Sequence, residues 1–362
     1  MNKILVIVGS LESAPSVYEK MSHLLSVSIV EPSVVLETGL TGYGLVLLNI
    51  SDLSGDQIQS LKPLLRSLRN TVVICGVESG SAKQSVQAQA LRAKELVYID
   101  RSLEEIVDAV RRYTGDYSVP DLPEDVPDAT RGAALLACQV MDELAFSVVL
   151  DKPMPIKRSL ESVAAISTAL QTDGLDAWVS AVENHHSYTF YHSLLVAGLV
   201  VAFGSERGMN QTSLSLLGLG GLIHDLGKLH LPLSILDKPG RLDEAEFELV
   251  RQHPLFSKQI LDEHSEVPKQ VVEMAVLHHE YLDGTGYPFG YVKDQLSEMV
   301  RMMTICDIFA ALSERRSYKE AYGPRQSYAI LFEMGEKIDQ KLLKDFRKVI
   351  FSPDTSVARR RA

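Results

Sequence analysis

The stretch that decides the fold of the larger part of this chain reads GLIHDLGKLHLP at residues 221–232, RQHP at 251–254 and HHEYLDGTGYP at 278–288. Imidazoles and carboxylates recur here within a sequence of otherwise apolar, helical pattern. Together these groups suit first-row divalent metals. The adjacent pair His224-Asp225 offers one nitrogen ligand and one carboxylate that can bridge two ions. Two ions about 3.5–4 Å apart can hold a phosphodiester and generate hydroxide near neutral pH, so the stretch predicts a two-metal phosphodiesterase built on helices.

Taken alone, each of these side chains has a structural explanation as well as a chemical one. A single histidine on an apolar helix is more often a buried core residue than a ligand, and His253 is as readily a surface residue. The acids are harder to place, because Asp225 ends the apolar run LLGLGGLIH and Asp307 lies within MMTICDIFAAL. A buried carboxylate needs a cation or a metal. Since these acids, His192 and the His278-His279 pair fall on consecutive predicted helices, a shared metal cluster is the better interpretation.

The composition excludes several classes of protein. A net charge of −11 argues against broad binding of a nucleic-acid polymer. The sequence has no apolar run of about eighteen residues or more, so it predicts no membrane span. The first residues, MNKILVIVGS, lack a signal-peptide cleavage pattern, and Cys75, Cys138 and Cys306 are scattered without a CxxC motif. We therefore expect a cytoplasmic protein that acts on neither a membrane nor a nucleic-acid polymer.

Residues 1–115 alternate strand-like and helix-like patterns. The strand-like runs are KILVIVG (3–9), VVLETG (34–39), GLVLLNI (44–50), TVVICGV (71–77) and ELVYID (95–100). This alternation predicts an α/β domain with a parallel sheet.

The length and rhythm of this domain resemble the receiver domain of two-component signalling. Gly9-Ser10-Leu11 stands where receivers carry an acidic pair, and Asn49 where they carry the phosphoacceptor aspartate. Gly76 replaces the hydroxyl residue, and Arg101 lies near the lysine position. An asparagine does not accept phosphate by the same chemistry, and the Mg²⁺ site lacks its carboxylates. We therefore expect a degenerate receiver-like module for contact or dimerisation, with a homodimer as a candidate assembly; a plain structural α/β domain is the alternative.

Residues 116–175 are predicted to be a linker followed by connector helices. Three prolines and several acids in YSVPDLPEDVPDATR indicate the linker, and RGAALLACQVMDELAFSVV and KRSLESVAAISTALQ have helical periodicity. Residues 176–350 show helical patterns throughout, and residues 351–362 read as a flexible tail. Asp243 and Glu246 have the spacing of a capping box at the start of one predicted helix. The expected fold class is thus an N-terminal α/β domain followed by an all-α bundle.

The motifs of residues 176–350 resemble the HD-GYP family, a branch of the HD-domain metal-dependent phosphohydrolases. The matching segments, in the family's order, are HSLLVA (192–197), HDLGK (224–228), LPLSILDKPGRL (231–242), HP (253–254), HHEYLDGTGYP (278–288), CDIFAAL (306–312) and RRSYK (315–319). A chance HD pair is common, but HDxGK followed by HHExxDGxGYP is not. The resemblance implies an α-helical fold and an enzyme that hydrolyses cyclic di-GMP to pGpG or on to GMP.

Site residues follow from the resemblance by position. The implied metal ligands are His192, His224, Asp225, His253, His278, His279 and Asp307. Asp225 would be the bridging, catalytic carboxylate, and Lys228 would act with it by contacting a substrate phosphate. Further substrate contacts are implied at Gly286, Tyr287, Pro288, Arg316 and Lys319. The implied cofactors are two divalent ions, Fe or Mn, and the loop 286–288 is also a candidate contact surface for GGDEF-domain proteins.

The sequence departs from the family at three positions. Tyr188 stands where some members carry a glutamate that supports a third metal, which is why we expect two ions. Ala310 replaces the second aspartate of the family's D-x-x-D-A motif, one helical turn after Asp307, and Tyr281 replaces a basic residue after HHE. The loss at Ala310 keeps two alternatives open. One is a catalytically weak nucleotide-binding or protein-interaction module, and the other is a hydrolase for a different cyclic dinucleotide.

Overall fold

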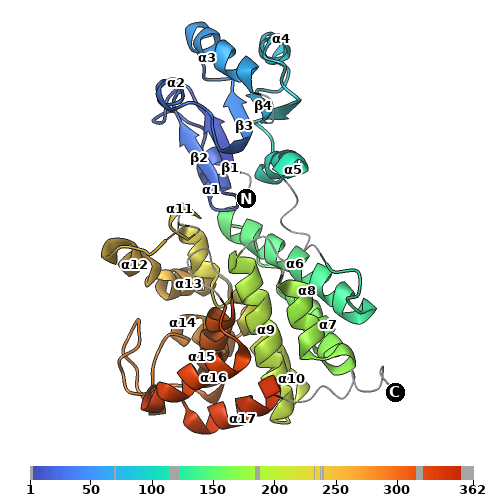
Figure 1. Ribbon diagram of the computed structural model, residues 1–362, viewed down its shortest axis with the longest axis vertical. Coiled ribbons are helices and arrows are strands. Elements are labelled where there is room, and N and C mark those ends of the chain that lie inside the picture. Colours follow the sequence, from blue (N-terminus) through green and yellow to red (C-terminus); the bar gives the residue numbers. More distant parts are fainter. Residues whose placement is uncertain are drawn as a thin grey trace. The chain divides into compact units, whose positions relative to one another are not determined.

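The computed structural model describes residues 3–68, 71–114, 122–183, 188–231, 233–236, 238, 240–314 and 321–351. The chain divides into two compact units near residue 116, each with its own hydrophobic core (Figure 1). The domain boundaries expected from the sequence, at 115, 175 and 350, stay predictions.

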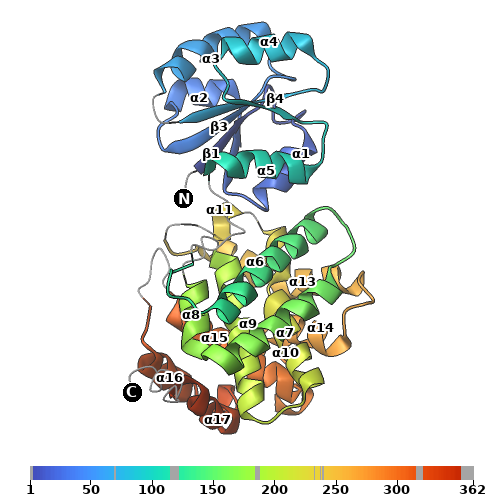
Figure 2. The same cartoon turned by 90° about the vertical axis from the view of Figure 1, so that its right-hand side faces the viewer.

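The first unit is a parallel sheet of five strands in the order β2-β1-β3-β4-β5. Its elements are β1 (Lys3–Ile7), α1 (Ser16–Ser22), β2 (Val27–Val30), α2 (Pro32–Thr38), β3 (Tyr43–Asn49), α3 (Gly55–Ser67), β4 (Val72–Val77), α4 (Ala82–Ala90), β5 (Glu95–Tyr98) and α5 (Leu103–Thr114). Figure 2 shows α2, α3 and α4 on one face of the sheet and α1 and α5 on the other. Helices on both faces bury most residues of the central strands β1, β3 and β4, in agreement with their almost continuously apolar sequences. This strand order is that of doubly wound flavodoxin-like folds, as expected for a receiver-like unit.

The expected strand at residues 34–39 is wrong. The second strand is Val27–Val30, and residues 34–38 lie in α2. Val34 and Val35 suggested a strand because β-branched residues favour sheets. Pro32 decides otherwise, because it occupies the first turn of α2, where its missing N–H is not needed.

At the carboxyl edge of this sheet, the positions that a receiver uses for phosphorylation are occupied by other residues. Asn49 is buried at the end of β3 and accepts a hydrogen bond from the Ser51 hydroxyl at 3.0 Å. A Cβ at Gly76 would lie 2.6 Å from the Tyr18 hydroxyl, so the tyrosine fills the space that a larger side chain would need. The edge is therefore built from neutral side chains at these two positions, in agreement with a degenerate receiver-like unit.

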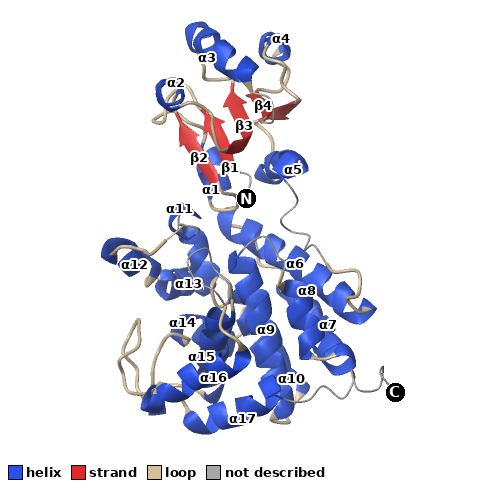
Figure 3. Ribbon diagram, viewed as in Figure 1, coloured by secondary structure: helices blue, strands red, loops and turns tan. Residues whose placement is uncertain are grey.

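The second unit is helical. Figure 3 shows the strands confined to the first unit. The helices of the second unit are α6 (Asp128–Val149), α7 (Ile156–Asp173), α8 (Leu175–Val182), α9 (Tyr188–Glu206), α10 (Gln211–Ile223), η1 (Leu226–His230), α11 (Leu233–Leu236), α12 (Glu244–Val250), α13 (His253–Asp262), α14 (Lys269–Leu277), η2 (Lys293–Gln295), α15 (Glu298–Ser313), α16 (Pro324–Glu333), η3 (Gly335–Lys337) and α17 (Gln340–Phe351). The expected fold class, α/β followed by an all-α bundle, is confirmed. The capping box of Asp243 and Glu246 at the start of α12 is present as well.

Helix α9 is the central helix of the bundle. It packs against α7, α8, α10, α15 and α17, and its apolar side chains from Leu194 to Phe203 are almost all buried. A helix that is apolar on all sides needs such cover on all sides. The expected connector helices α6 and α7 contribute to the same core, so in this structure they pack as part of the bundle.

Among the described helices, α6 alone has the length and apolarity that crossing a bilayer requires, and half of its most apolar stretch is buried. Its buried side chains, including Ala137, Met141 and Leu144, lie in the core shared with α9. A core helix passes the same test of length and composition.

A close approach between α9 and α10 sets the positions of two of the predicted ligands. A Cβ at Gly221 on α10 would lie 2.5 Å from the Cα of Ala197 on α9, so no larger residue fits there. His192 lies on α9 and His224 directly follows α10. The contact at Gly221 therefore brings the two imidazoles to a ring distance of 5.3 Å.

Because Trp178 belongs to the core around α9, we expect its truncation to cause a large loss of stability. This side chain is fully buried, and its Nε1–H donates to the carbonyl of Leu194 at 3.1 Å. Trp178→Ala should lower the free energy of unfolding by about 3–5 kcal/mol, because it leaves a cavity in the core. The matched control Phe332→Ala removes a ring that is 62% exposed and should cost within about 0.5 kcal/mol. Denaturant unfolding followed by circular dichroism measures both, and equal losses would contradict the assignment of Trp178 to the core.

Candidate metal centre

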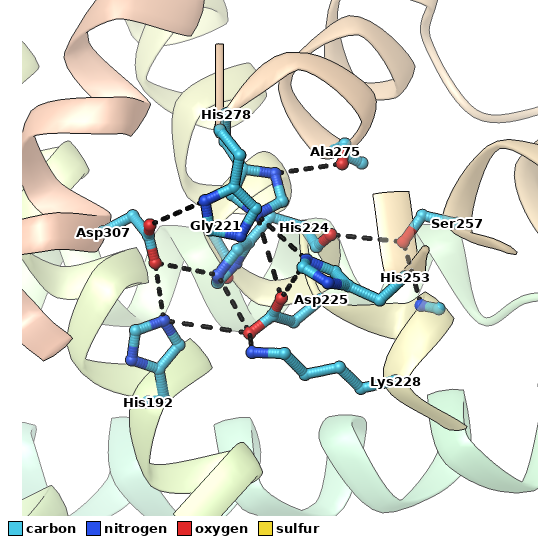
Figure 4. A network of polar contacts seen from close by, with 12 residues as sticks. His192, Gly221, His224, Asp225, Lys228, His253, Ser257, Ala275, His278 and Asp307 are labelled. Carbon is cyan, nitrogen blue, oxygen red and sulfur yellow. Dashed lines mark hydrogen bonds and ion pairs between the residues drawn. The ribbon is translucent and has the colours of Figure 1, made fainter. Parts of the chain in front are cut away.

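The seven predicted ligands come from several helices and meet in one place. Figure 4 labels six of them, all except His279. They are His192 within α9, His224 and Asp225 at the end of α10, His253 at the start of α13, His278 and His279 after α14, and Asp307 within α15. All are buried except His279, which is partly exposed. Helix ends supply five of the seven, where the chain can turn side chains of neighbouring residues toward one point.

The carboxylate of Asp225 lies at the middle of this cluster. Its Oδ1 atom is 3.2 Å from Nε2 of His253 and 3.8 Å from Nε2 of His278. Its Oδ2 atom is 3.4 Å from Nε2 of His224 and 3.8 Å from Nε2 of His192. Each oxygen thus faces a different pair of imidazoles, which is the arrangement that a carboxylate between two ions requires.

Asp307 faces the same cluster from α15. Its Oδ1 atom is 2.9 Å from Nε2 of His192 and 3.8 Å from Nε2 of His224, and its Oδ2 atom is 3.7 Å from Nδ1 of His279. Three sets of ligand atoms lie close enough together to hold an ion: His253, His278 and His279; His192, His224 and Asp307; and His224, Asp225 and His278.

Backbone carbonyls fix the orientation of three imidazoles. Nδ1 lies 2.9 Å from the Gly221 carbonyl in His224, 2.8 Å from the Val250 carbonyl in His253 and 3.0 Å from the Ala275 carbonyl in His278. A carbonyl only accepts hydrogen bonds, so Nδ1 carries the proton in each ring. The lone pair of Nε2 therefore points into the cluster, as in histidines that bind metals.

This orientation leaves acceptor atoms facing one another. Nε2 of His253 and Nε2 of His278 are 3.4 Å apart. Nε2 of His224 and Oδ1 of Asp225 are buried and make no hydrogen bond to any residue that the structure describes. Buried acceptors without a donor are costly. Divalent cations held among these residues would satisfy such acceptors, so the residues fit a metal centre.

The charge states of most of these groups are those that bind metals. Burial lowers the pKa of His278 well below its usual value and that of His279 to about 3, so both rings are neutral. Burial alone would raise the pKa of Asp225, but the ammonium of Lys228 holds it well below its usual value. Neutral imidazole and ionised carboxylate are the forms that coordinate metal ions.

His192 differs from the other imidazoles. Burial lowers its pKa, but the carboxylates of Glu314 and Asp307 raise it to about 10. Nδ1 donates to Oε1 of Glu314 at 2.5 Å, and Nε2 donates to Oδ1 of Asp307 at 2.9 Å. The proton on Nε2 lies where a metal ion would bind. Sequence reasoning missed Glu314, because it opens the charged run ERR and reads as a solvated residue.

The turn after His224 is held by the start of α13. Ser257 Oγ accepts the N–H of Gly227 at 2.9 Å and donates to the carbonyl of His224 at 3.3 Å. A Cβ at Gly227 would lie 1.9 Å from the carbonyl oxygen of His253. Only glycine fits there, which explains the glycine of the HDLGK motif. The same turn directs Lys228 back to the centre, with its Nζ 2.5 Å from Oδ2 of Asp225.

The loop at 286–288 lies beside the cluster. The ring of Tyr287 stacks on His279 with a centroid distance of 4.7 Å, and the Arg251 guanidinium lies 4.7 Å from the centroid of the same tyrosine ring. Gly286 and Pro288 flank this tyrosine, so the three predicted loop residues adjoin the partly exposed ligand His279.

Glu280 holds this loop in place. Its buried carboxylate accepts hydrogen bonds from the backbone N–H groups of Phe289 at 2.7 Å, Gly290 at 3.1 Å and Tyr291 at 3.1 Å. Sequence reasoning counted Glu280 among the acids of the motif and missed its contact with the loop, although its place between two ligands and a glycine-rich turn was a usable signal.

Three predicted features lie outside the described residues. They are Arg316, Lys319 and the tail 352–362. Position 188 is described as the first residue of α9, but the side chain of Tyr188 is not.

The helical unit is similar to several known proteins. A family model described as an HD domain matches residues 171–342. A cyclic di-GMP phosphodiesterase of Pseudomonas aeruginosa is 33% identical over 199 residues, which are 51% of this chain and 48% of that protein. A 3'3'-cGAMP-specific phosphodiesterase of Vibrio cholerae is 31% identical over 257 residues, which are 71% of this chain and 54% of that protein. The chain therefore spans about half the length of the curated relatives it matches.

A solved structure resembles most of the chain. An HDG"Y"P protein from Bdellovibrio bacteriovorus superposes with a TM-score of 0.51, covering 82% of this chain and 87% of that one at 15% identity. At this level of identity the likeness concerns the fold.

The geometry predicts that metal binding depends on Asp225. The wild-type protein should retain divalent metal through desalting, and Asp225→Ala should weaken metal affinity by more than about tenfold, because both groups of imidazoles lose their shared carboxylate. The control Asp262→Ala removes an exposed carboxylate that pairs with Lys258 on α13. Elemental analysis and titration with Mn²⁺ measure the effect. Equal metal affinity in Asp225→Ala and Asp262→Ala would contradict the proposed centre.

Removal of the Glu280 carboxylate should loosen the loop without emptying the centre. Glu280→Ala leaves three backbone N–H groups without their acceptor, at a cost of about 1–3 kcal/mol. Hydrogen exchange at Phe289, Gly290 and Tyr291 should speed up by about tenfold or more. Glu280→Gln keeps an acceptor oxygen and should show a smaller effect. Unchanged exchange in Glu280→Ala would show that other contacts hold the loop.

Proposed function

We propose that the chain belongs to the HD-GYP family of HD-domain proteins and that it is a metal-dependent phosphodiesterase that hydrolyses cyclic di-GMP to pGpG, GMP or both. The observation that carries the proposal is the position of Asp225, whose two oxygens face two different pairs of imidazoles. The curated relatives named above act on cyclic di-GMP or on 3'3'-cGAMP.

The proposed cofactors are two divalent ions, Fe or Mn, held by the seven ligand residues. Such ions neutralise phosphate oxygens and lower the pKa of a water molecule when they are bound. The protein's part is to hold the imidazoles and carboxylates in position. The carbonyls that accept the Nδ1 protons of His224, His253 and His278 fix the tautomer and orientation of these rings before any substrate arrives.

Lys228 is the proposed substrate contact nearest the centre. Its ammonium lies 2.5 Å from Oδ2 of Asp225 and is partly exposed. A cation in this place can bind a phosphate oxygen and offset the charge that develops as the phosphodiester is cleaved. Arg316 and Lys319 are proposed to bind the phosphate backbone on the strength of their positions in the family motif.

The loop 286–288 is proposed to line the substrate site. Tyr287 lies between His279 and Arg251, so a phosphate or a base bound at the partly exposed His279 would meet the loop. Phe289, the next residue after the loop, is 46% exposed and offers an apolar contact for a GGDEF-domain partner.

The N-terminal unit is proposed to serve contact or dimerisation in place of phosphorylation, because Asn49 occupies the phosphoacceptor position. We place the protein in the cytoplasm, in keeping with three cysteines that are all free and buried.

Hydrolysis of 3'3'-cGAMP is a second candidate function, favoured by the long match to the Vibrio cholerae relative. A weakly active binding module is a third, favoured by the loss of the second motif carboxylate at Ala310.

A substrate panel tests the proposal. Metal-loaded wild-type protein should convert cyclic di-GMP to pGpG or GMP, detected by chromatography. Asp225→Ala should lower the rate by at least about a hundredfold, since loss of outer-shell partners alone costs 10–100-fold. Asp262→Ala should match the wild type. Faster turnover of 3'3'-cGAMP would favour the second candidate, and nucleotide binding without product would favour the third.

A further inference from the structure

The buried carboxylate of Glu314 contacts a predicted metal ligand. We propose that Glu314 is a positioning residue that orients His192 for metal binding, in place of the motif carboxylate that this chain lacks at Ala310. The inference rests on the proposed metal-dependent function. It concerns a residue outside the set of predicted ligands.

The side chains of Glu314 and His192 are in close contact and are shielded from solvent. Oε1 of Glu314 lies 2.5 Å from Nδ1 of His192, and the two residues are 1% and 4% exposed. A charged carboxylate is buried at this depth only where a specific partner compensates it. His192 supplies that compensation, although it lies 122 positions away along the chain.

The contact determines where the other ring nitrogen points. Because Nδ1–H donates to Glu314, Nε2 faces Oδ1 of Asp307 at 2.9 Å and Oδ2 of Asp225 at 3.8 Å. His224, His253 and His278 use backbone carbonyls for the same purpose. A carboxylate partner also makes the imidazole a stronger ligand than a carbonyl does.

The position of Glu314 explains how it can act for position 310. Asp307, Ala310 and Glu314 are spaced at i, i+3 and i+7, so they follow one face of α15 and its C-terminal cap. The N–H of Glu314 donates to the carbonyl of Ala310 at 3.0 Å, which continues the helical bonding to the cap. Ala310 is fully buried and carries no polar side-chain atom. Glu314, one turn onward, therefore supplies a carboxylate from the same side of α15 as position 310 and contacts His192.

Three variants separate the possible roles of this carboxylate. Glu314→Ala removes the acceptor, Glu314→Gln keeps an acceptor without the charge, and Ala310→Asp combined with Glu314→Ala restores a carboxylate at the motif position. Glu298→Ala is the control, because it removes a partly exposed acid at the other end of α15 that pairs with Arg207. Circular dichroism confirms that each variant is folded.

Metal affinity is the primary measurement, because it does not depend on the identity of the substrate. Titration with Mn²⁺ should show affinity lowered about 10–100-fold in Glu314→Ala, lowered less in Glu314→Gln, and largely restored in the double variant. With cyclic di-GMP as substrate, kcat should fall in Glu314→Ala at limiting metal and recover with excess Mn²⁺, while KM changes little. Glu298→Ala should match the wild type in every assay.

The outcomes separate this proposal from the proposed function. If Glu314→Ala binds Mn²⁺ as tightly as the wild type, the role of Glu314 is refuted while the phosphodiesterase proposal stands. If a folded double variant stays as weak as Glu314→Ala, the substitution for position 310 is refuted. If the wild type binds Mn²⁺ but hydrolyses no cyclic dinucleotide, the proposed activity fails, and the affinity series still decides the role of Glu314.

Discussion

The helical unit depends on a cluster of negative charge buried among imidazoles whose lone pairs point inward. Asp225, Asp307 and Glu314 are each less than a tenth exposed and lie within one core. Placing such ions in a protein interior costs several kcal/mol each unless positive charge is close. Lys228 and a protonated His192 supply part of that charge. Nε2 of His224 and Oδ1 of Asp225 have no hydrogen-bond partner among the described residues, and divalent ions would provide further positive charge there.

This requirement couples metal binding to the packing of the bundle. The ligands come from α9, α10, α13, α14 and α15, so each ion would join helices that are distant in sequence. Two glycines make the approach possible, because Gly221 lets α10 contact α9 and Gly227 lets the turn after α10 contact α13. Ligand geometry is thus built into backbone contacts and would be formed before the metal binds.

The two units of the chain differ in the polar groups that they bury. The first unit has the neutral side chain of Asn49 and the hydroxyl of Tyr18 at the carboxyl edge of its sheet, at positions where a receiver concentrates charge. The second unit concentrates charge in its interior and compensates it with histidines. In our proposal the first unit therefore contributes contacts and the second contributes chemistry.

The sequence by itself determined the order of the two fold classes and the residues of the candidate centre. Histidines and acids are rare inside apolar helices, so His192, His224 and Asp307 stand out from the pattern of their neighbours alone, although their role as ligands stays a prediction. The local sequence pattern gave the wrong secondary structure at residues 34–38, because Val34 and Val35 are typical of a strand but Pro32 begins a helix. Tertiary structure alone decided the partners of the ligands. Glu314 reads as one more residue of a charged run, and only folding brings its carboxylate to His192. A contact between residues so far apart depends on how helices pack, which no local stretch of sequence records.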